Sequence, residues 1–174
     1  MSGDPVPSGT ARSKPWVLVR AGASRLAIHS DWVRELLALP AVTRLPGLPP
    51  DALGLITWRG RAVPAIDLGA RLGLGWVGGA GETAQPAGRR MAVVVADGTR
   101  HVALAVDAVD GVELLAADSI APLPEGLGAA GPAVREHGRT RRDGTLVLLL
   151  DVAGLLGVDR TPTEDVRAGD FWGQ

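Results

Sequence analysis

The sequence has 174 residues, of which 46% are hydrophobic and 3% aromatic, and its formal net charge is -1. This length suits one compact domain or two small subdomains that share a core, and the apolar content excludes wholesale disorder. The near-zero charge provides no overall attraction for nucleic acid or an anionic membrane. Because the chain has no cysteine, disulfides, thiolate zinc sites and cysteine nucleophiles are excluded.

Both ends of the chain are polar. Residues 1–15 are rich in proline, glycine and serine and predict a flexible N-terminal tail without the apolar core of a signal peptide. No apolar run approaches the roughly 20 residues that span a bilayer. Residues 159–174 predict a C-terminal tail, in which Phe171 and Trp172 dock on the body or on another protein. We therefore expect a cytoplasmic protein with no direct membrane contact.

The segment between the tails contains an internal similarity. Residues 17–28, VLVRAGASRLAI, align with residues 93–104, VVVADGTRHVAL, at an offset of 76. Residues 59–73, RGRAVPAIDLGARLG, align with residues 143–157, DGTLVLLLDVAGLLG, at an offset of 84. The pattern indicates a duplication, and the alternative is a chance similarity of valine-rich strands.

Each repeated unit has the pattern of β-structure. Short runs of valine, leucine and isoleucine are separated by the turn sequences AGAS, ADGT and RDGT, as in a small barrel or sandwich. A short helix is expected at the end of each unit, where Asp67 and Asp151 are placed to cap the first turn. The predicted fold class is mainly all-β.

Residues 30–39, SDWVRELLAL, are ambiguous, because their apolar spacing also suits a short helix. Their repeat counterpart, residues 106–115, contains an Asp-Gly pair that disfavours a helix. We therefore predict a strand, in which the period of two places Val33 and Glu35 on the same face.

Three patterns that invite an enzymatic interpretation have weak support. Residues 73–78 and 126–131 match G-x-G-x-x-G, but neither lies between a buried strand and a helix, as a dinucleotide site requires. No G-x-S-x-G motif is present. The histidines have no metal-ligand spacing and are interpreted as packing residues; they are His29, His101 and His137. We predict no catalytic residue, no cofactor and no metal site.

A basic run, REHGRTRR, covers residues 135–142. It contains Glu136, lacks aromatic residues and precedes an Asp-Gly turn, which together predict a solvated loop. A β-barrel that binds anions or nucleic acid through this run is the less favoured alternative, and our prediction is no nucleic-acid partner.

Residues 54–64, GLITWRGRAVP, place Arg59 and Gly60 between two apolar runs. A two-residue hairpin turn prefers Asn-Gly or Asp-Gly, since those residues adopt positive φ with little strain. An arginine at this position indicates a side chain that is displayed for a partner.

These segments together resemble the CheW family of bacterial chemotaxis coupling proteins, from about residue 15 to residue 158. The most specific part is PGLPPDALGLITWRGRAVPAIDL, which is similar to the family's proline loop, G-V-I-N-L-R-G and V-P-V-V-D-L. The second half resembles the family's V-D-x-V segment and its closing L-L-D-x-x-x-L-L.

The resemblance implies one domain over residues 16–158, built of two small five-stranded SH3-like β-barrels that share an apolar core. The two intertwined subdomains are expected at roughly 16–90 and 91–158. It also implies a non-catalytic adaptor that couples the cytoplasmic tips of methyl-accepting chemoreceptors to the regulatory domain of a CheA-type histidine kinase, within membrane-associated arrays. Other CheW-like domains are further expected partners. A divergent scaffold of a non-flagellar pathway, or a competitor of the usual coupler, is the alternative.

The resemblance further implies a receptor-binding site at Val33, Glu35, Arg59 and Gly60, with Gly54 shaping the approach to its strand. An intramolecular Glu35 to Arg59 pair is the structural alternative.

The sequence departs from the family where Asn-Leu is replaced by Thr57-Trp58 and where a usual proline is His29. Trp58 is predicted either as a core residue or as an aromatic anchor of the interface.

Overall fold

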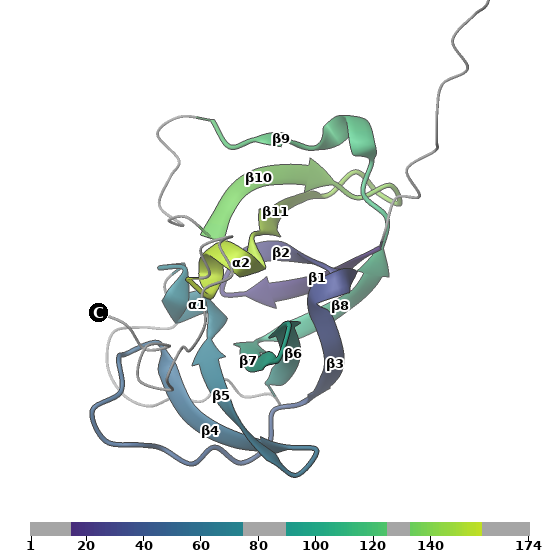
Figure 1. Ribbon diagram of the computed structural model, residues 1–174. Helices are drawn as coiled ribbons and strands as arrows, with labels where there is room; N and C mark the ends of the chain where they lie inside the picture. The colour runs from purple at the N-terminus through teal and green to yellow at the C-terminus, as the bar shows by residue number, and fades with distance from the viewer. Residues whose placement is uncertain (1–14, 75–89, 125–132, 158–174) are drawn as a thin grey trace, which may run out of the picture.

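A computed structural model describes residues 15–74, 90–124 and 133–157. The described chain forms two β-sheets with two short α-helices and two single turns of 3-10 helix (Figure 1). The elements are β1 (Trp16–Ala21), β2 (Ser24–His29), η1 (Ser30–Trp32), β3 (Val33–Ala38), β4 (Ala52–Trp58), β5 (Arg61–Asp67), α1 (Leu68–Arg71), β6 (Met91–Asp97), β7 (Arg100–Val106), β8 (Ala108–Glu113), η2 (Ala117–Ser119), β9 (Ala121–Pro122), β10 (Val134–Arg139), β11 (Leu146–Leu150) and α2 (Val152–Leu155).

Apart from β9, a sixth strand that the prediction of two five-stranded barrels did not include, the two sheets have the same strand order under the repeat. The upper sheet in Figure 1 runs β8-β1-β2-β11-β10-β9, and the lower one runs β3-β6-β7-β5-β4. At the offset of 76 residues, β1, β2 and β3 correspond to β6, β7 and β8. At the offset of 84 residues, β4 and β5 correspond to β10 and β11. The internal duplication is therefore present in the fold, and the predicted mainly β class with two SH3-like subdomains is confirmed.

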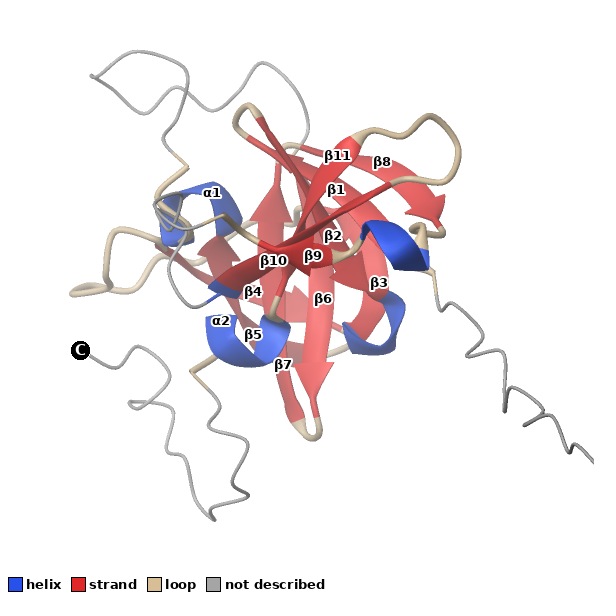
Figure 2. Cartoon of the chain, turned by 90° about the horizontal axis from the view of Figure 1, so that it is seen from above, coloured by secondary structure: helices blue, strands red, loops and turns tan. Residues whose placement is uncertain are grey.

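Each sheet takes strands from both halves of the chain. β3, β4 and β5 of the first half complete the sheet that contains β6 and β7, while β8 to β11 complete the sheet of β1 and β2. The expected boundary near residue 90 thus separates the two repeats, whereas each barrel is built from both of them. Viewed from above, the upper sheet lies over the lower one, and α1 and α2 stand on the same side (Figure 2).

Apolar side chains form three clusters that explain this arrangement. The largest lies between the sheets and takes residues from β1, β2, β6 and β7 and from both helices; among them Val19, Leu26 and Leu104 are fully buried. A second cluster, which includes Ile56 and Val63, belongs to the lower sheet, and a third belongs to the upper sheet. Alternate residues of a strand face opposite sides, so each central strand contributes to its own barrel and to the shared core.

Both helix caps predicted from the sequence are present. The Oδ1 atom of Asp67 accepts a hydrogen bond from the Ala70 amide at 3.0 Å, and that of Asp151 accepts one from the Gly154 amide at 3.1 Å. Each cap satisfies an amide that the first helical turn leaves free.

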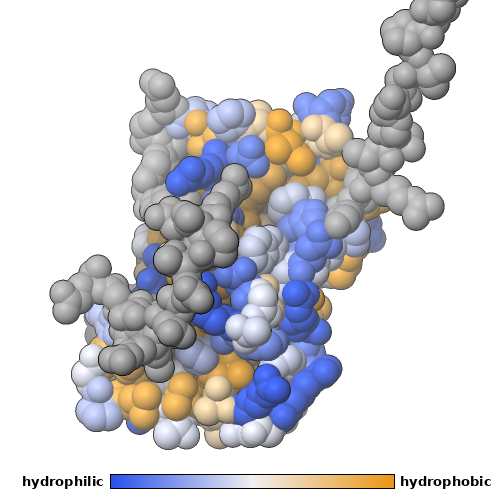
Figure 3. Space-filling model, in the orientation of Figure 1, coloured by the Kyte–Doolittle hydropathy of each residue, from blue (hydrophilic) through white to orange (hydrophobic). Residues whose placement is uncertain are grey.

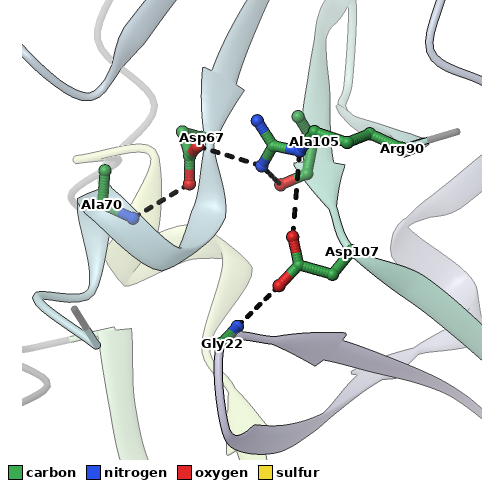
Figure 4. Close-up of polar contacts among 6 residues, drawn as sticks. All are labelled: Gly22, Asp67, Ala70, Arg90, Ala105 and Asp107. Carbon is green, nitrogen blue, oxygen red and sulfur yellow. Dashed lines mark hydrogen bonds and ion pairs between the residues drawn. The ribbon is translucent and has the colours of Figure 1, made fainter. Parts of the chain in front are cut away.

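Arg90 joins the two sheets beside α1 (Figure 4). Its Nη2 lies 2.9 Å from Oδ2 of Asp67, and its Nε lies 3.8 Å from Oδ1 of Asp107. The other oxygen of Asp107 accepts a hydrogen bond from the Gly22 amide at 2.7 Å, in the β1–β2 turn. A cavity of about 80 Å³ lies among these groups. Both carboxylates therefore have partners within the chain. The cluster is structural, because it fixes Asp107, where the chain passes from β7 in the lower sheet to β8 in the upper one.

The strand predicted over residues 30–39 is confirmed from Val33 onwards, but the predicted placement of its side chains is wrong. Val33 pairs with Val95, whereas Glu35 pairs with Val94, so a β-bulge separates them. Val95 faces the shared core and Val94 faces the lower barrel. The bulge therefore places Val33 and Glu35 on opposite faces, and β8 contains the corresponding bulge between Val109 and Gly111.

The basic run also differs from its prediction. Residues 135–139 belong to β10, which pairs with β11, and Thr140 forms a bridge with Leu115, so only Arg141 and Arg142 lie in a turn. Its polar side chains hid the strand pattern, because Gly138 is the one buried residue between Arg135 and Arg139 and has no side chain to mark an alternation. The two predicted tails, most of both glycine motifs, Phe171 and Trp172 lie outside the described residues.

Candidate functional site

The β4–β5 hairpin presents the arginine that the sequence singled out. Trp58 pairs with Arg61, so Arg59 and Gly60 are the two turn residues, with φ values of 47° and 74°. Positive φ at both positions defines a type I′ turn, which asparagine and glycine adopt most easily. Within the described ranges, Arg59 is the one non-glycine residue with positive φ. Holding an arginine there costs about 1–2 kcal/mol.

Glu35 of β3 holds this turn from across the barrel. One of its oxygens, Oε2, accepts hydrogen bonds from Trp58 Nε1 and from Arg59 Nε, each at 2.9 Å. β3 and β4 are opposite edges of the five-stranded sheet, so these bonds join the two edges and close the barrel. The Trp58 and Arg59 hydrogen bonds, followed by the charge of Arg59, lower the pKa of Glu35 below its ordinary value.

Trp58 is a core residue. Its side chain is 8% exposed and belongs to the apolar cluster of the lower barrel. The ring packs 5.0 Å from the ring of His101, and the guanidinium carbon of Arg59 lies 5.1 Å from the Trp58 ring centroid, within range of a cation–π contact. Trp58 therefore fills the interior of the lower barrel, and its ring supports the guanidinium of Arg59.

The guanidinium of Arg59 is the exposed part of this cluster. Its side chain is 68% exposed, and its hydrogen bond to Glu35 uses only Nε. Among the described residues, both terminal nitrogens lack a hydrogen-bond partner. They form a rigid pair of donors suited to a carboxylate or to backbone carbonyls. The intramolecular pair foreseen as an alternative exists, and it leaves the outer edge of the guanidinium available.

The other predicted site residues lie elsewhere. Val33 packs against the shared core. Gly54 is buried beside the segment that leads into β4, where a Cβ atom would lie 2.1 Å from the carbonyl oxygen of Thr43. Its φ of 138° also disfavours any side chain. Gly54 therefore sets the path of β4, while Glu35, Trp58, Arg59 and Gly60 form the cluster.

Sequence reasoning missed two contacts of this cluster, one between Trp58 and His101 and one between Trp58 and Glu35. His101 was interpreted only as a packing residue, and nothing in the sequence connected it with Trp58. The hydrogen bond between Trp58 and Glu35 spans 23 positions along the chain, so no local pattern reveals it.

Two features of the described part of the chain bear on other functions. It contains no group of three or more metal-ligating side chains that could hold a metal ion. None of its helices has the length and apolarity needed to cross a membrane.

A solved structure has a similar fold. The scaffolding protein TtCheW from Thermoanaerobacter tengcongensis superposes with a TM-score of 0.68 at 24% sequence identity, over 84% of this chain and 94% of that one. At this level of identity the match concerns the fold alone.

Sequence comparison points to the same family. A probable chemotaxis protein CheW from Rhizobium etli is 32% identical over 109 residues, and a chemotaxis protein CheW from Rhizobium meliloti is 30% identical over 109 residues. Each match covers 63% of this chain and 66% of the relative. Residues 15–160 match the sequence model of the family described as CheW-like domain, and the chain therefore belongs to that family.

Proposed function

We propose that this chain is a non-catalytic adaptor in chemosensory signalling, which couples the cytoplasmic tips of methyl-accepting chemoreceptors to the regulatory domain of a CheA-type histidine kinase. Its family and the names of its relatives, chemotaxis and scaffolding proteins, support this role. The adaptor acts in the cytoplasm and is recruited to membrane-associated receptor arrays. Other CheW-like domains are further partners of the same assembly.

The observation that carries the proposal is the conformation of Arg59. Asparagine would occupy this turn with less strain, yet the chain keeps an arginine at a φ of 47°. Backbone strain that surrounding contacts maintain is commonly associated with functional surfaces. Glu35 fixes the guanidinium and Gly60 permits the turn, so the arginine is oriented before a partner arrives, which reduces the entropy lost on binding.

The receptor surface in this proposal centres on Glu35, Arg59 and Gly60. Val33, Gly54 and Trp58 contribute by positioning β3 and the β4–β5 hairpin. Contacts in an array must be reversible, so each interface is expected to have a Kd near the micromolar range, or about -8 kcal/mol, and to gain strength from repetition.

The test uses Arg59→Asn, because asparagine removes the guanidinium and suits the positive φ. Binding of the purified chain is measured by calorimetry to two fragments from the same organism, a receptor cytoplasmic hairpin and the kinase regulatory domain. We expect the variant to bind the receptor at least about tenfold more weakly, through loss of a charged hydrogen bond worth about 1.5–3 kcal/mol. Its Tm is expected to equal or exceed that of the wild type, and kinase binding to persist.

Arg44→Ala is the matched control, because Arg44 is also an exposed arginine but lies outside the hairpin. If the wild type binds neither fragment, the coupling role is wrong and the scaffold serves other partners. If Arg59→Asn binds the receptor as well as the wild type does, Arg59 is not a contact residue.

A further inference from the structure

We propose that the upper barrel carries a second docking surface, which binds an acidic amphipathic segment of a protein partner. This β10–β11 surface is separate from the Arg59 hairpin and does not depend on the proposed function. It consists of the residues Val112, Leu114, Arg139, Arg141, Arg142 and Leu146.

The residues of the β10–β11 surface come together where the upper barrel closes. Leu115 and Thr140 form an isolated bridge, and the Arg141 amide donates to the carbonyl of Leu114 at 3.1 Å. On the other side of β10, Arg139 pairs with Leu146. Leu115 and Thr140 face the barrel interior, so their sequence neighbours face outwards and form one continuous outer face.

The apolar side chains of the β10–β11 surface are unusually exposed. Val112 is 55% exposed, Leu114 is 38% exposed and Leu146 is 51% exposed. They are three of the five exposed large hydrophobic side chains in the described part of the chain. On the face drawn in Figure 3, the upper barrel shows apolar surface bordered by hydrophilic residues. Apolar side chains gathered on one face, with a polar rim, mark interaction surfaces.

The repeat provides an internal control for this exposure. The lower barrel has the same strand order, and its residues that correspond to Leu114 and Leu146 are Ala38 and Ala62. A barrel of this fold therefore closes with alanine at both positions. The larger leucines of the upper barrel are not needed for folding, which supports a role on the surface.

The arginines of the β10–β11 surface carry little compensating charge. Arg142 is 83% exposed and reaches Glu113 only at 4.0 Å, while Nη1 of Arg139 donates to the carbonyl of Gly144. Arg141 has no ion pair with any described residue. The nearby carboxylate of Asp143 is held by hydrogen bonds from the Thr140 hydroxyl at 2.5 Å and from the Thr145 amide at 3.1 Å, and its charge also interacts with Arg25. The three arginines therefore outnumber the two nearby carboxylates, those of Glu113 and Asp143.

Exposed leucines between arginines fit a partner of complementary pattern. An amphipathic segment places its apolar side chains on Leu114 and Leu146 and its carboxylates beside the guanidinium groups, which bind carboxylates with two parallel hydrogen bonds. Nucleic acid would use the arginines but not the leucines, and the surface contains no aromatic side chain on which a base could stack. The pattern therefore favours an acidic protein segment.

The experiment measures fluorescence anisotropy of two labelled synthetic peptides mixed with the full chain. One peptide is a helix with glutamate on one face and leucine on the other, and its partner has the same composition in shuffled order. We expect the amphipathic peptide to bind at least tenfold more tightly than the shuffled one, and more weakly as salt is added. Leu146→Ser and Arg141→Glu should each weaken binding at least fivefold. Both residues are exposed, and an unchanged Tm establishes that the variants are folded.

Arg59→Asn serves as the control, because it alters the receptor surface and should leave peptide binding unchanged. The proposal is overturned if the two peptides bind equally, if neither binds, or if Leu146→Ser has no effect. Single-stranded thymidine oligonucleotides that bind as tightly as the amphipathic peptide would assign the surface to nucleic acid instead. Loss of peptide binding in Arg59→Asn would show that the peptide binds at the Arg59 hairpin and not at the β10–β11 surface.

Discussion

Arg59 shows how one residue combines strain and support. Its positive φ is unfavourable for a side chain, while Glu35 and the ring of Trp58 hold the guanidinium in place. An ion pair this exposed stabilises the fold only weakly, because solvent screens it. Stability therefore does not explain an arginine at this position, which supports its proposed role as a contact residue.

The pKa of Glu35 leads to a prediction about pH. The pKa of Glu35 is lower in the folded state than its unfolded value of 4.5, so ionised Glu35 stabilises the folded protein at pH values above 4.5. This stabilisation is lost as the pH falls through the folded-state pKa. Glu35→Gln should therefore be less stable than the wild type at pH 7, and the difference should shrink below pH 4.5. Urea unfolding at several pH values measures it. Glu136→Gln, at an exposed carboxylate of β10, controls for the loss of charge.

Gly54 and Gly111 form a natural pair for separating close contact from backbone strain. Their φ values are 138° and 132°, but a Cβ atom would meet the Thr43 carbonyl at Gly54 and open space at Gly111. Gly111→Ala should cost about 1–3 kcal/mol from strain alone. Gly54→Ala should cost about 1–3 kcal/mol more, because the approaching backbone must move. Equal free energies of unfolding for the two variants would show that the contact at Gly54 is easily relieved.

At the scale of elements, the edge strands β3 and β8 determine where the site lies. Each contains a bulge at the same point of the repeat. The side chain before the bulge faces the shared core, and the one after it faces the interior of the barrel to which the strand belongs. In β3 the residue after the bulge is Glu35, and it meets the hairpin of β4 and β5. Without the bulge, Glu35 would face the shared core and could not close the barrel.

The two capped helices allow a second comparison. Asp67→Ala and Asp151→Ala each remove an N-cap, at a cost of about 0.5–2 kcal/mol. Asp67 also pairs with Arg90, whose side chain is only 16% exposed, so its loss leaves a charged group less well compensated. Asp67→Ala should therefore destabilise by about 1–3 kcal/mol more than Asp151→Ala in denaturant unfolding. In an Arg90→Met background, which removes the charge, the two variants should converge; a persisting difference would contradict this role of Arg90.

For the whole molecule, the exchange of strands between repeats makes the two barrels interdependent. Neither half of the chain contains a complete sheet. One sheet combines β1 and β2 with β8 to β11, and the other combines β6 and β7 with β3 to β5. The largest apolar cluster also draws on both halves. One cooperative unit is the expected consequence, although the fold contains two barrels.

Separate expression of residues 15–90 and 91–157 tests this interdependence. Each half alone should lack a cooperative unfolding transition, since its strands have unpaired edges and its share of the core is exposed. Mixing the halves should restore the circular dichroism spectrum and the transition of the intact chain. A cooperative transition of either half alone would instead mean that one repeat can pair its own strands.

Most of the strand pattern, the duplication, both helix caps and the unusual arginine turn could be predicted from the sequence by itself, whereas β10 was not. These features depend on residues close together along the chain, where alternation, turn preference and capping act locally. The tertiary structure decided that each repeat, from its third strand onwards, joins the first two strands of the other repeat, that a bulge turns Glu35 away from the face of Val33, and that Glu35 meets Trp58 and Arg59. Strand register is set by pairing between distant segments, and a shift of one residue reverses every side chain, so no local pattern contains this information.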